Sequence, residues 1–355
     1  MPPRIDARSC VLAAASIVLL LGALAFSPAH SPELQAQKKT EQQDERKKPV
    51  KPELGSKSPQ ENPQKGYKIG VNVELVVVHT TITDKKGQFV SGLKKENFKV
   101  FEDNVNQNIV SFSQEDVPLS LGIVIDTSGS MRNKFDNVIK AALAFIRASN
   151  PNDEEFLIGF NNEVELLEDY TNDIDLITDD LNNTVVTGGT ALWDAIYLAV
   201  QKAQGGSKPK KAVIVITDGE DQDSYYKLDE MIAKVQESDV QVYGIGFLNE
   251  TPDKGLFGHW TKSAPEKAHD ALQRISDETG AKAFFPKDVS EIHAIVSEIA
   301  FELRNQYSIG YTSSNAAHDG TWRRIRVTLD APASSGLRVR YRLGYFSPKP
   351  AAPGK

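Results

Sequence analysis

The chain has 355 residues, of which 40% are apolar and 25% are charged, and its formal net charge is -7. This composition is typical of a soluble globular protein, and the length predicts two domains. The acidic balance, together with the lack of a basic stripe interleaved with aromatic residues, argues against a nucleic-acid partner.

The first 29 residues have the pattern of a secretory signal peptide. Arg4 and Arg8 precede an uncharged stretch, 11–29, that is rich in Leu and Ala. The alternative is a retained membrane anchor, because the stretch is only slightly shorter than the roughly 20 residues that span a bilayer. Both interpretations place the rest of the chain in the periplasm or outside the cell, and a membrane is a partner only if the segment is retained.

Cysteine usage agrees with export from a bacterium. Cys10 is the only cysteine and lies within the predicted signal peptide, so the mature chain would form no disulfide. Residues 30–66 hold eight Lys or Arg and six Asp or Glu with almost no large apolar side chains, which predicts a disordered linker. A short disordered tail is predicted for residues 349–355.

Residues 67–116 are predicted to form β-strands. The segments that carry this prediction are β-branched or alternating, and they lie at 71–83, 98–102 and 109–112. Turn signals at 84–87 and 103–104 separate them. Because no helical period interrupts these segments, they indicate one part of a β-sandwich.

Between residues 117 and 304, apolar strands alternate with amphipathic helices. We expect strands at 121–126, 156–160, 164–167, 212–217, 240–247 and 281–285. We expect helices at 135–148, 174–181, 191–200, 228–236, 268–278 and 289–303. The alternation predicts an α/β fold with a doubly wound, mostly parallel sheet. Glycine and proline residues between 249 and 267 predict a long loop.

Strands return in residues 305–348, with segments at 306–312, 324–329 and 337–345. Neither this region nor residues 67–116 is long enough to form a stable hydrophobic core by itself, because a small domain buries too little of its surface. We therefore expect both regions to build one sandwich, with the α/β domain inserted between them. The basic residues Arg323, Arg324 and Arg326 fit alternate outward positions on an edge strand better than a phosphate site.

The most informative segment is LGIVIDTSGS, residues 121–130. A buried strand ends on Asp126, and Ser128 and Ser130 follow at once. Thr190 opens a predicted helix and Asp218 ends a second apolar strand, and both places face the ligand-binding edge of an open α/β sheet. Small oxygen ligands suit a hard divalent cation such as Mg²⁺. Taken alone, residues 121–130 also fit a simpler alternative to a metal site, in which the Asp and Ser residues at the strand end cap the next helix.

These five residues, in this order and context, resemble the von Willebrand factor type A domain. The resemblance implies a metal-ion-dependent adhesion site that holds Mg²⁺ or Mn²⁺. It implies that Ser128, Ser130 and Thr190 coordinate the metal through their hydroxyls, and that Asp126 and Asp218 hold the site partly through water. The sixth position is then left for an exposed Asp or Glu of a protein partner.

Segments on both sides of this region resemble those of a bacterial exported subfamily related to the same domain. They lie at 92–103, before the α/β region, and at 307–311, after it. The resemblance implies that the β-strands and the type A domain occur together in exported proteins.

The residues do not favour an enzyme, and we expect no catalytic residue. An aspartyl phosphatase needs an acid/base Asp two positions after the first, where this chain has Ser128. No G-x-S-x-G element surrounds the serines, and phosphate-binding glycine loops are absent from the sequence. The six histidines show no paired zinc spacing. For Glu220, Asp221 and Asp223, a solvated loop is favoured over a second cation site.

The sequence therefore predicts an exported, metal-dependent protein-binding or adhesion module. Two alternatives remain open. One is an envelope assembly scaffold in which the metal is structural, and the other is a metal-dependent phosphatase.

Overall fold

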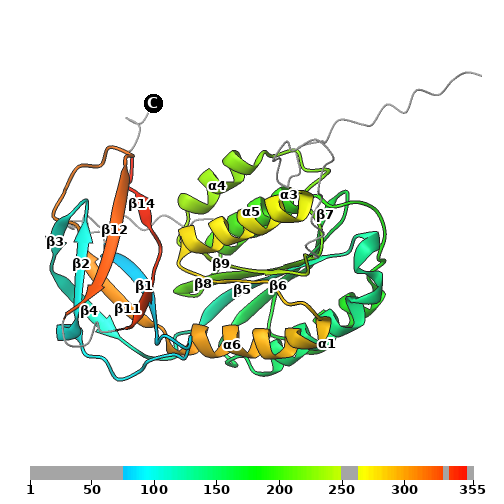
Figure 1. Ribbon diagram of the computed structural model, residues 1–355, viewed down its shortest axis with the longest axis horizontal. Helices are drawn as coiled ribbons and strands as arrows, with labels where there is room; N and C mark the ends of the chain where they lie inside the picture. Colours follow the sequence, from blue (N-terminus) through cyan, green and yellow to red (C-terminus); the bar gives the residue numbers. More distant parts are fainter. Residues whose placement is uncertain (1–74, 249–262, 331–335, 350–355) are drawn as a thin grey trace, which may run out of the picture. The chain divides into compact units, whose positions relative to one another are not determined.

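The computed structural model describes residues 75–248, 263–330 and 336–349, which all belong to one compact unit. The predicted signal peptide and linker lie outside the described residues, as do most of the predicted C-terminal tail and most of the predicted loop at 249–267. The described elements form an α/β domain and a β-sandwich (Figure 1). Among them, no helix is long and apolar enough to cross a membrane.

The centre of the α/β domain is a six-stranded sheet in the described part of the chain. Its strands, in spatial order, are β10 (Ala283–Phe284), β9 (Gln241–Gly246), β8 (Lys210–Thr217), β5 (Leu119–Asp126), β6 (Glu154–Phe160) and β7 (Val164–Thr171). β6 and β7 form an antiparallel hairpin, and the other neighbours are parallel. Since β5 and β8 run in the same direction, Asp126 and Thr217 lie at the same edge.

Helices cover both faces of this sheet (Figure 1). One face packs against α1 (Phe135–Arg147), α2 (Ile174–Asn183) and α6 (Ile292–Asn305), and the other packs against α3 (Leu192–Gln204), α4 (Leu228–Gln236) and α5 (Ala264–Thr279). In β5, Ile123 and Ile125 belong to the first core, whereas Val124 belongs to the second. Burial on both faces explains why β5 is a continuous apolar run.

The sandwich consists of two four-stranded sheets within the described ranges. One has the order β13 (Arg338–Arg340), β1 (Leu75–Thr83), β11 (Tyr307–Thr312) and β4 (Ile109–Ser113). The other has the order β14 (Gly344–Phe346), β12 (Trp322–Leu329), β2 (Phe98–Glu102) and β3 (Val105–Gln107). Strands from both sides of the α/β domain therefore share one core, which confirms the predicted fold class.

The α/β domain is inserted between two neighbouring strands of the sandwich. β4 is the last strand before the domain and β11 is the first strand after it, and they pair antiparallel. Ser113 of β4 lies opposite Ser308 of β11. The chain thus leaves the sandwich and returns to it at adjacent positions.

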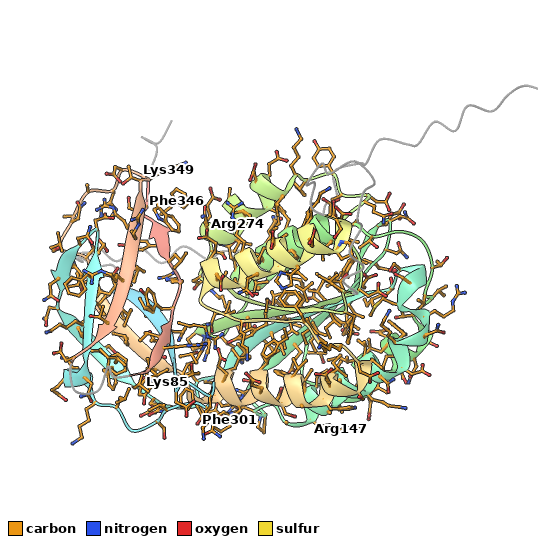
Figure 2. The ribbon with its side chains drawn as sticks, viewed as in Figure 1. Lys85, Arg147, Arg274, Phe301, Phe346 and Lys349 are labelled. Carbon is orange, nitrogen blue, oxygen red and sulfur yellow. The ribbon has the colours of Figure 1, made fainter. Side chains whose placement is uncertain are left out.

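Glu302 of α6 joins the sandwich to the α/β domain. Its carboxylate accepts hydrogen bonds from Thr81 Oγ1 of β1 (3.0 Å) and from the Tyr243 hydroxyl of β9 (2.9 Å). It also forms an ion pair with Arg340 of β13. On the same helix, Phe301 contacts the ring of Phe89 edge-on at 5.8 Å between ring centroids, and Figure 2 labels Phe301 where α6 approaches the sandwich.

Several predicted elements differ from those observed. The segment 337–345 forms two short strands, β13 and β14, that belong to different sheets. The chain bends between them because Arg340 pairs with Glu302 and the backbone N–H of Leu343 donates to Glu278 O. β3 was not predicted, because it has only three residues, of which two are exposed.

Helix α5 begins at residue 264 and not at 268, so the loop prediction for 264–267 is wrong. Ser263 accepts a hydrogen bond from the backbone of Glu266, and the Glu266 side chain accepts one from the backbone of Ser263. This capping box, with Pro265 in the first turn, starts the helix. The placement of Arg323 was wrong as well: β12 lies between β14 and β2, and Arg323 is 2% exposed beside Glu102 and Asp319.

Candidate metal centre

Asp126 occupies the buried centre of the predicted site. It ends β5 and has no exposed surface (0%). Its Oδ1 accepts a hydrogen bond from the backbone N–H of Ser128 (2.8 Å), and its Oδ2 accepts one from Thr217 Oγ1 (2.6 Å). Burial raises the pKa of Asp126 and the charge of Asp218 adds to the effect, while the hydrogen bonds from Ser128 and Thr217 oppose it.

A row of hydroxyls connects the loop after β5 to the end of β8. Ser128 Oγ lies 3.0 Å from Ser130 Oγ, and Ser130 Oγ donates to Asp218 Oδ1 over 2.6 Å. The side chain of Asp218 is 2% exposed, and its Oδ2 forms a 2.5 Å ion pair with Lys134 Nζ. The tight loop is part of a short 3₁₀ helix, Gly129–Asn133, whose first residues turn the serines toward Asp218.

The segment that carries Thr190 is fastened to the same loop through its backbone. Gly129 N–H donates to Gly188 O (3.1 Å), and Thr187 N–H donates to Thr127 O (2.8 Å). Thr190 is buried and lies against the turn that follows Asp218, since a Cβ on Gly219 would be 3.2 Å from Thr190 Oγ1. The structure therefore brings all five predicted residues to one edge of the sheet.

The donor set fits a hard cation. It consists of oxygen atoms only, from two buried carboxylates and three hydroxyls, and oxygen is what Mg²⁺ and Mn²⁺ prefer. Among the described residues, Lys134 is the one ammonium bonded to these carboxylates, so with both ionised these three side chains together carry one excess negative charge. No group of three or more His, Cys, Asp or Glu side chains in the described ranges is arranged to hold a metal. A cation at this edge would therefore need the hydroxyls as ligands besides the two carboxylates.

A cavity of about 320 Å³ opens at this edge. Its wall includes two of the five residues, Ser130 and Asp218. It is lined by Ser130, Lys134, Asp218, Glu220, Gln222, Phe247, Leu248 and Pro265.

Comparison with known families agrees with this architecture. The sequence profile of the von Willebrand factor type A domain matches residues 120–298, which is half of the chain. The chain belongs to this family. The match spans the chain from β5 into α6, so all five site residues lie within the von Willebrand factor type A (VWA) domain.

Several solved structures are similar to part of this chain at low sequence identity. The von Willebrand factor domain of the type V pili tip protein Mfa5 from Porphyromonas gingivalis is 13% identical, covers 52% of this chain and 95% of its own, and gives a TM-score of 0.42. An aerotolerance-related membrane protein from Bacteroides fragilis is 18% identical, with 52% and 98% covered and a TM-score of 0.40. The minor pilin PilB from Streptococcus sanguinis is 15% identical, with 54% and 62% covered and a TM-score of 0.41. No curated protein matches the chain.

Three polar residues of the VWA site were not predicted to take part. Lys134 precedes α1 and pairs with Asp218, and Thr217 bonds Asp126 from the neighbouring strand. Asp223 accepts hydrogen bonds from Thr190 N–H (3.1 Å) and Asn162 Nδ2 (2.7 Å). The position of Thr217 directly before Asp218 is a sequence signal for its role, whereas Lys134 has no comparable signal.

The acidic loop after Asp218 is not simply a solvated face. Asp221 Oδ1 accepts a hydrogen bond from Trp193 N–H (3.1 Å) and also bonds Ser224 Oγ. Burial raises the pKa of Asp221 to about 6. Together with Asp223, this residue holds the start of α3 beside the site, which corrects the prediction of a merely solvated loop.

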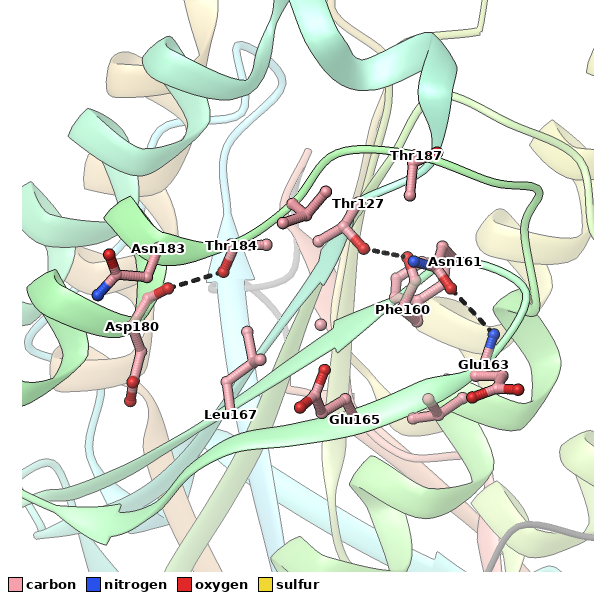
Figure 3. Close-up of a pocket in the computed structure, with 13 residues that line it drawn as sticks. Thr127, Phe160, Asn161, Glu163, Glu165, Leu167, Asp180, Asn183, Thr184 and Thr187 are labelled. Carbon is pink, nitrogen blue, oxygen red and sulfur yellow. Dashed lines mark hydrogen bonds between the residues drawn. The ribbon is translucent and has the colours of Figure 1, made fainter.

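A larger cavity, about 660 Å³, lies on the other side of the loop that follows β5 (Figure 3). Its residues come from the loop after β5, from the β6–β7 hairpin, and from the end of α2 with the segment that follows it. It is lined by Thr127, Gly159, Phe160, Asn161, Glu163, Val164, Glu165, Leu167, Asp180, Asn183, Thr184, Val185 and Thr187. Three of the lining residues carry carboxylates, namely Glu163, Glu165 and Asp180, and none of the lining residues is basic. This cavity is therefore acidic.

Proposed function

We propose that the protein is an exported, metal-dependent protein-binding module. The VWA domain holds Mg²⁺ or Mn²⁺ through Asp126, Ser128, Ser130, Thr190 and Asp218, and it captures an exposed Asp or Glu of a protein partner. The observation that carries this proposal is the chain of hydrogen bonds that joins Asp126 to the Ser128 backbone, Ser128 Oγ to Ser130 Oγ, and Ser130 Oγ to Asp218, beside an open cavity.

The chemistry of the donors explains why such a site favours an anionic ligand. A bound divalent cation supplies a Lewis-acidic centre that accepts one further oxygen ligand. Ser128, Ser130 and Thr190 contribute neutral hydroxyls, so they leave most of the charge of the ion uncompensated. Asp218 is already paired with Lys134, which reduces its contribution further.

The acidic surroundings restrict which partners fit. A partner that presents one carboxylate at the metal faces Glu220 in the wall of the adjoining cavity, and three more carboxylates, those of Glu163, Glu165 and Asp180, line the second cavity. Like charges across an interface are unfavourable, so the surface around the partner's carboxylate should be neutral or basic. This combination distinguishes the proposed partner from a generally acidic protein.

Calorimetric titration with Mg²⁺ tests the site. Ser130→Ala removes an exposed hydroxyl that bonds a carboxylate, and it should weaken binding by at least roughly tenfold. Ser207→Ala is the matched control, because Ser207 is also exposed and bonds Glu154 over 2.7 Å, far along the sheet from the site. Equal Mg²⁺ affinity in the wild type and in Ser130→Ala would contradict the assignment.

Capture of the partner should depend on the metal. In a pull-down from envelope extract, the protein should retain its partner in Mg²⁺ and lose it in a chelator. An assembly scaffold with a structural metal is the second candidate, and it would retain the partner equally in both conditions. The cavity beside Asp218, which gives a ligand access to the site, favours capture over a purely structural metal.

We propose binding rather than catalysis. The position where an aspartyl phosphatase carries its acid/base is Ser128, whose hydroxyl contacts Ser130. A metal-dependent phosphatase would hydrolyse a generic aryl phosphate in Mg²⁺, and we expect no such activity. Turnover that disappears in Asp126→Asn would overturn this part of the proposal.

Export is supported by the N-terminal sequence, with Arg4 and Arg8 before an uncharged stretch. Cell fractionation should place the mature chain in the periplasm or medium, shortened by its signal peptide. Recovery of the full-length chain in the cytoplasm would contradict export.

A further inference from the structure

Asn162 lies in the turn of the β6–β7 hairpin, and its side chain connects two other segments at the edge of the sheet that carries the proposed metal site. Its Oδ1 accepts a hydrogen bond from the backbone N–H of Gly189 over 2.9 Å, and its Nδ2 donates to Asp223 Oδ2 over 2.7 Å. Gly189 precedes Thr190 in the chain, and Asp223 belongs to the loop after β8. Asn162 is not one of the five proposed metal ligands, so the proposed function leaves this contact without a role.

The backbone of Thr190 is held from two sides. Its N–H donates to Asp223 Oδ2 over 3.1 Å, and its carbonyl oxygen accepts hydrogen bonds from the N–H groups of Gln222 (2.9 Å) and Asp223 (3.2 Å). The N–H of the next residue, Ala191, donates to Asn161 O over 2.6 Å. The backbone of Thr190 is therefore fixed between the β6–β7 turn and the loop after β8.

The backbone before Thr190 packs closely against these side chains. A Cβ added to Gly189 would lie 2.0 Å from Asp223 Oδ2 and 2.8 Å from Asn162 Nδ2. A Cβ added to Gly188 would lie 2.3 Å from Asn162 Oδ1, and the φ angle of Gly188 is +84°, which favours glycine. Because close-packed groups transmit displacements, a shift of the Asn162 side chain also shifts Thr190.

The turn that carries Asn162 also forms part of the wall of the larger cavity. Asn161 and Glu163, on either side of it, both line that cavity (Figure 3). Asn161 Oδ1 accepts the backbone N–H of Glu163 over 3.1 Å, and the backbone N–H of Asn161 donates to Glu163 O over 2.9 Å. These two hydrogen bonds hold the turn together as one unit. The turn therefore contacts the segment that carries Thr190 and borders the cavity at the same time.

We propose that Asn162 is a positioning residue for the metal site and that it couples this site to the β6–β7 turn. It holds Thr190 through Gly189 and Asp223, so the Thr190 hydroxyl is in place before a cation binds. Partners that orient a metal ligand in this way raise the affinity for the metal. Because coupling between two sites is reciprocal, a bound cation in turn restrains the β6–β7 turn and the wall of the larger cavity. The inference rests on the proposed function, since it needs a cation at Thr190.

Calorimetric titration with Mg²⁺ tests the positioning role. Asn162→Ala removes both hydrogen bonds, so Mg²⁺ affinity should fall at least about tenfold, while the melting temperature of the metal-free protein should change little because Asn162 is exposed.

Asn150→Ala is the matched control. Asn150 also donates to a carboxylate, that of Asp116 (3.0 Å), and also accepts a backbone N–H, that of Asn152 (3.0 Å). It precedes β6, at the opposite edge of the sheet, so Asn150→Ala should leave the Mg²⁺ affinity unchanged. Equal Mg²⁺ affinities of Asn162→Ala and Asn150→Ala would overturn the positioning role.

Hydrogen exchange measures the coupling without any binding partner. At Mg²⁺ concentrations that saturate each protein, exchange of the amide hydrogens in the turn 161–163 should slow at least about threefold in the wild type. In Asn162→Ala the turn should lose this protection, because the contact with Gly189 and Asp223 is gone. No Mg²⁺-dependent protection of the turn in the wild type, or full protection in Asn162→Ala, would overturn the coupling.

Failure of the proposed function gives a different result. If the wild type binds no Mg²⁺, or if Ser130→Ala binds it as tightly as the wild type, the metal assignment is wrong and the inference fails with it. If Ser130→Ala loses affinity and Asn162→Ala keeps it, the metal site stands and the role of Asn162 is overturned.

Discussion

Lys134 Nζ lies 2.5 Å from Oδ2 of Asp218, the carboxylate whose other oxygen accepts the hydroxyl of Ser130. An ammonium therefore occupies one side of a carboxylate that the proposed site offers to a divalent cation. This ion pair is mostly shielded, because the side chain of Asp218 is 2% exposed and that of Lys134 is 27% exposed.

Removing this ammonium should strengthen metal binding. In Lys134→Met, Asp218 loses a competing positive charge, so we expect the affinity for Mg²⁺ to rise by at least roughly threefold, or about 0.7 kcal/mol. Lys140→Met removes an exposed charge from α1, the helix that Lys134 precedes, and should leave the affinity unchanged. Calorimetric titration measures both variants, and weaker Mg²⁺ binding in Lys134→Met would contradict the expected competition.

Gly219 provides a steric test of Thr190. In Gly219→Ala the new Cβ would lie 3.2 Å from Thr190 Oγ1, so the hydroxyl must move. We expect Mg²⁺ affinity to fall by about tenfold or more, with little change in the melting temperature. In Gly129→Ala, the nearest atom to the new Cβ is Gly188 O at 3.7 Å, which is ordinary contact, so Mg²⁺ affinity should change little. Equal Mg²⁺ affinities of Gly219→Ala and Gly129→Ala would show that Thr190 is not part of the metal site.

Two adjacent glutamates at the start of β6 should give opposite dependences of stability on pH. Burial and then the charge of Asp153 raise the pKa of Glu155 from 4.5 to about 7. The folded protein therefore holds this proton more tightly than the unfolded chain, and the stabilisation present below pH 4.5 is lost as the pH rises to about 7. Glu155→Gln should raise the free energy of unfolding at pH 8 by about 2–3 kcal/mol, and by little at pH 4.

Glu154 is the matched control for that experiment. Burial alone would raise the pKa of Glu154, but hydrogen bonds from Ser207 and Ser120 lower it overall. Its stabilisation is present above pH 4.5 and is lost as the pH falls through the folded pKa. Glu154→Gln should thus lower stability at pH 8, as measured by urea unfolding. A parallel response of the two variants would contradict the assigned environments.

Substitution of Glu302, which joins the sandwich to the VWA domain, should strongly lower the free energy of unfolding. Glu302→Ala leaves Arg340, Tyr243 and Thr81 without their shared acceptor, so we expect a loss of about 3–5 kcal/mol in the free energy of unfolding. Glu298→Ala, on the same helix, breaks an exposed pair with Lys282 and should cost less than about 1 kcal/mol. Similar losses in the two variants would show that the buried pair is no more important than the exposed one.

The N-terminal strands should not fold without those that follow the VWA domain. β11 lies between β1 and β4, and β12 is the partner of β2. A fragment of residues 67–117 lacks both neighbours, so it should show no cooperative thermal transition by circular dichroism. A sharp transition from this fragment would contradict the shared core.

Much of the fold follows from local patterns in the sequence. β5 and β8 are apolar on both faces because helices cover both sides of the sheet, and β2 alternates because one face lies in the sandwich core. The pairing of strands more than 200 residues apart, such as Val78 with Ile309, was expected only from the small size of each β region. Local patterns do not specify the order of the strands within each sheet.

Sequence reasoning was less successful where a charged side chain is buried. Arg323 was predicted to point outward, yet it is buried near Glu102, a partner more than 200 residues away. For the same reason Lys134 escaped prediction: its partner Asp218 comes from a distant strand. The five site residues were recognisable because each follows a strand or opens a helix, where the fold class alone specifies the edge.

The position of the insertion has a mechanical consequence. Tension between Leu75 and Phe346 enters and leaves through the sandwich, because both residues lie in its strands. The VWA domain branches off between Ser113 and Ser308, which are paired across neighbouring strands. While the hydrogen bonds between β4 and β11 remain intact, the force passes directly from β4 to β11 and does not pass through the VWA domain. The oxygen atoms around Asp126 thus keep their spacing under a pull that would stretch a domain joined in series.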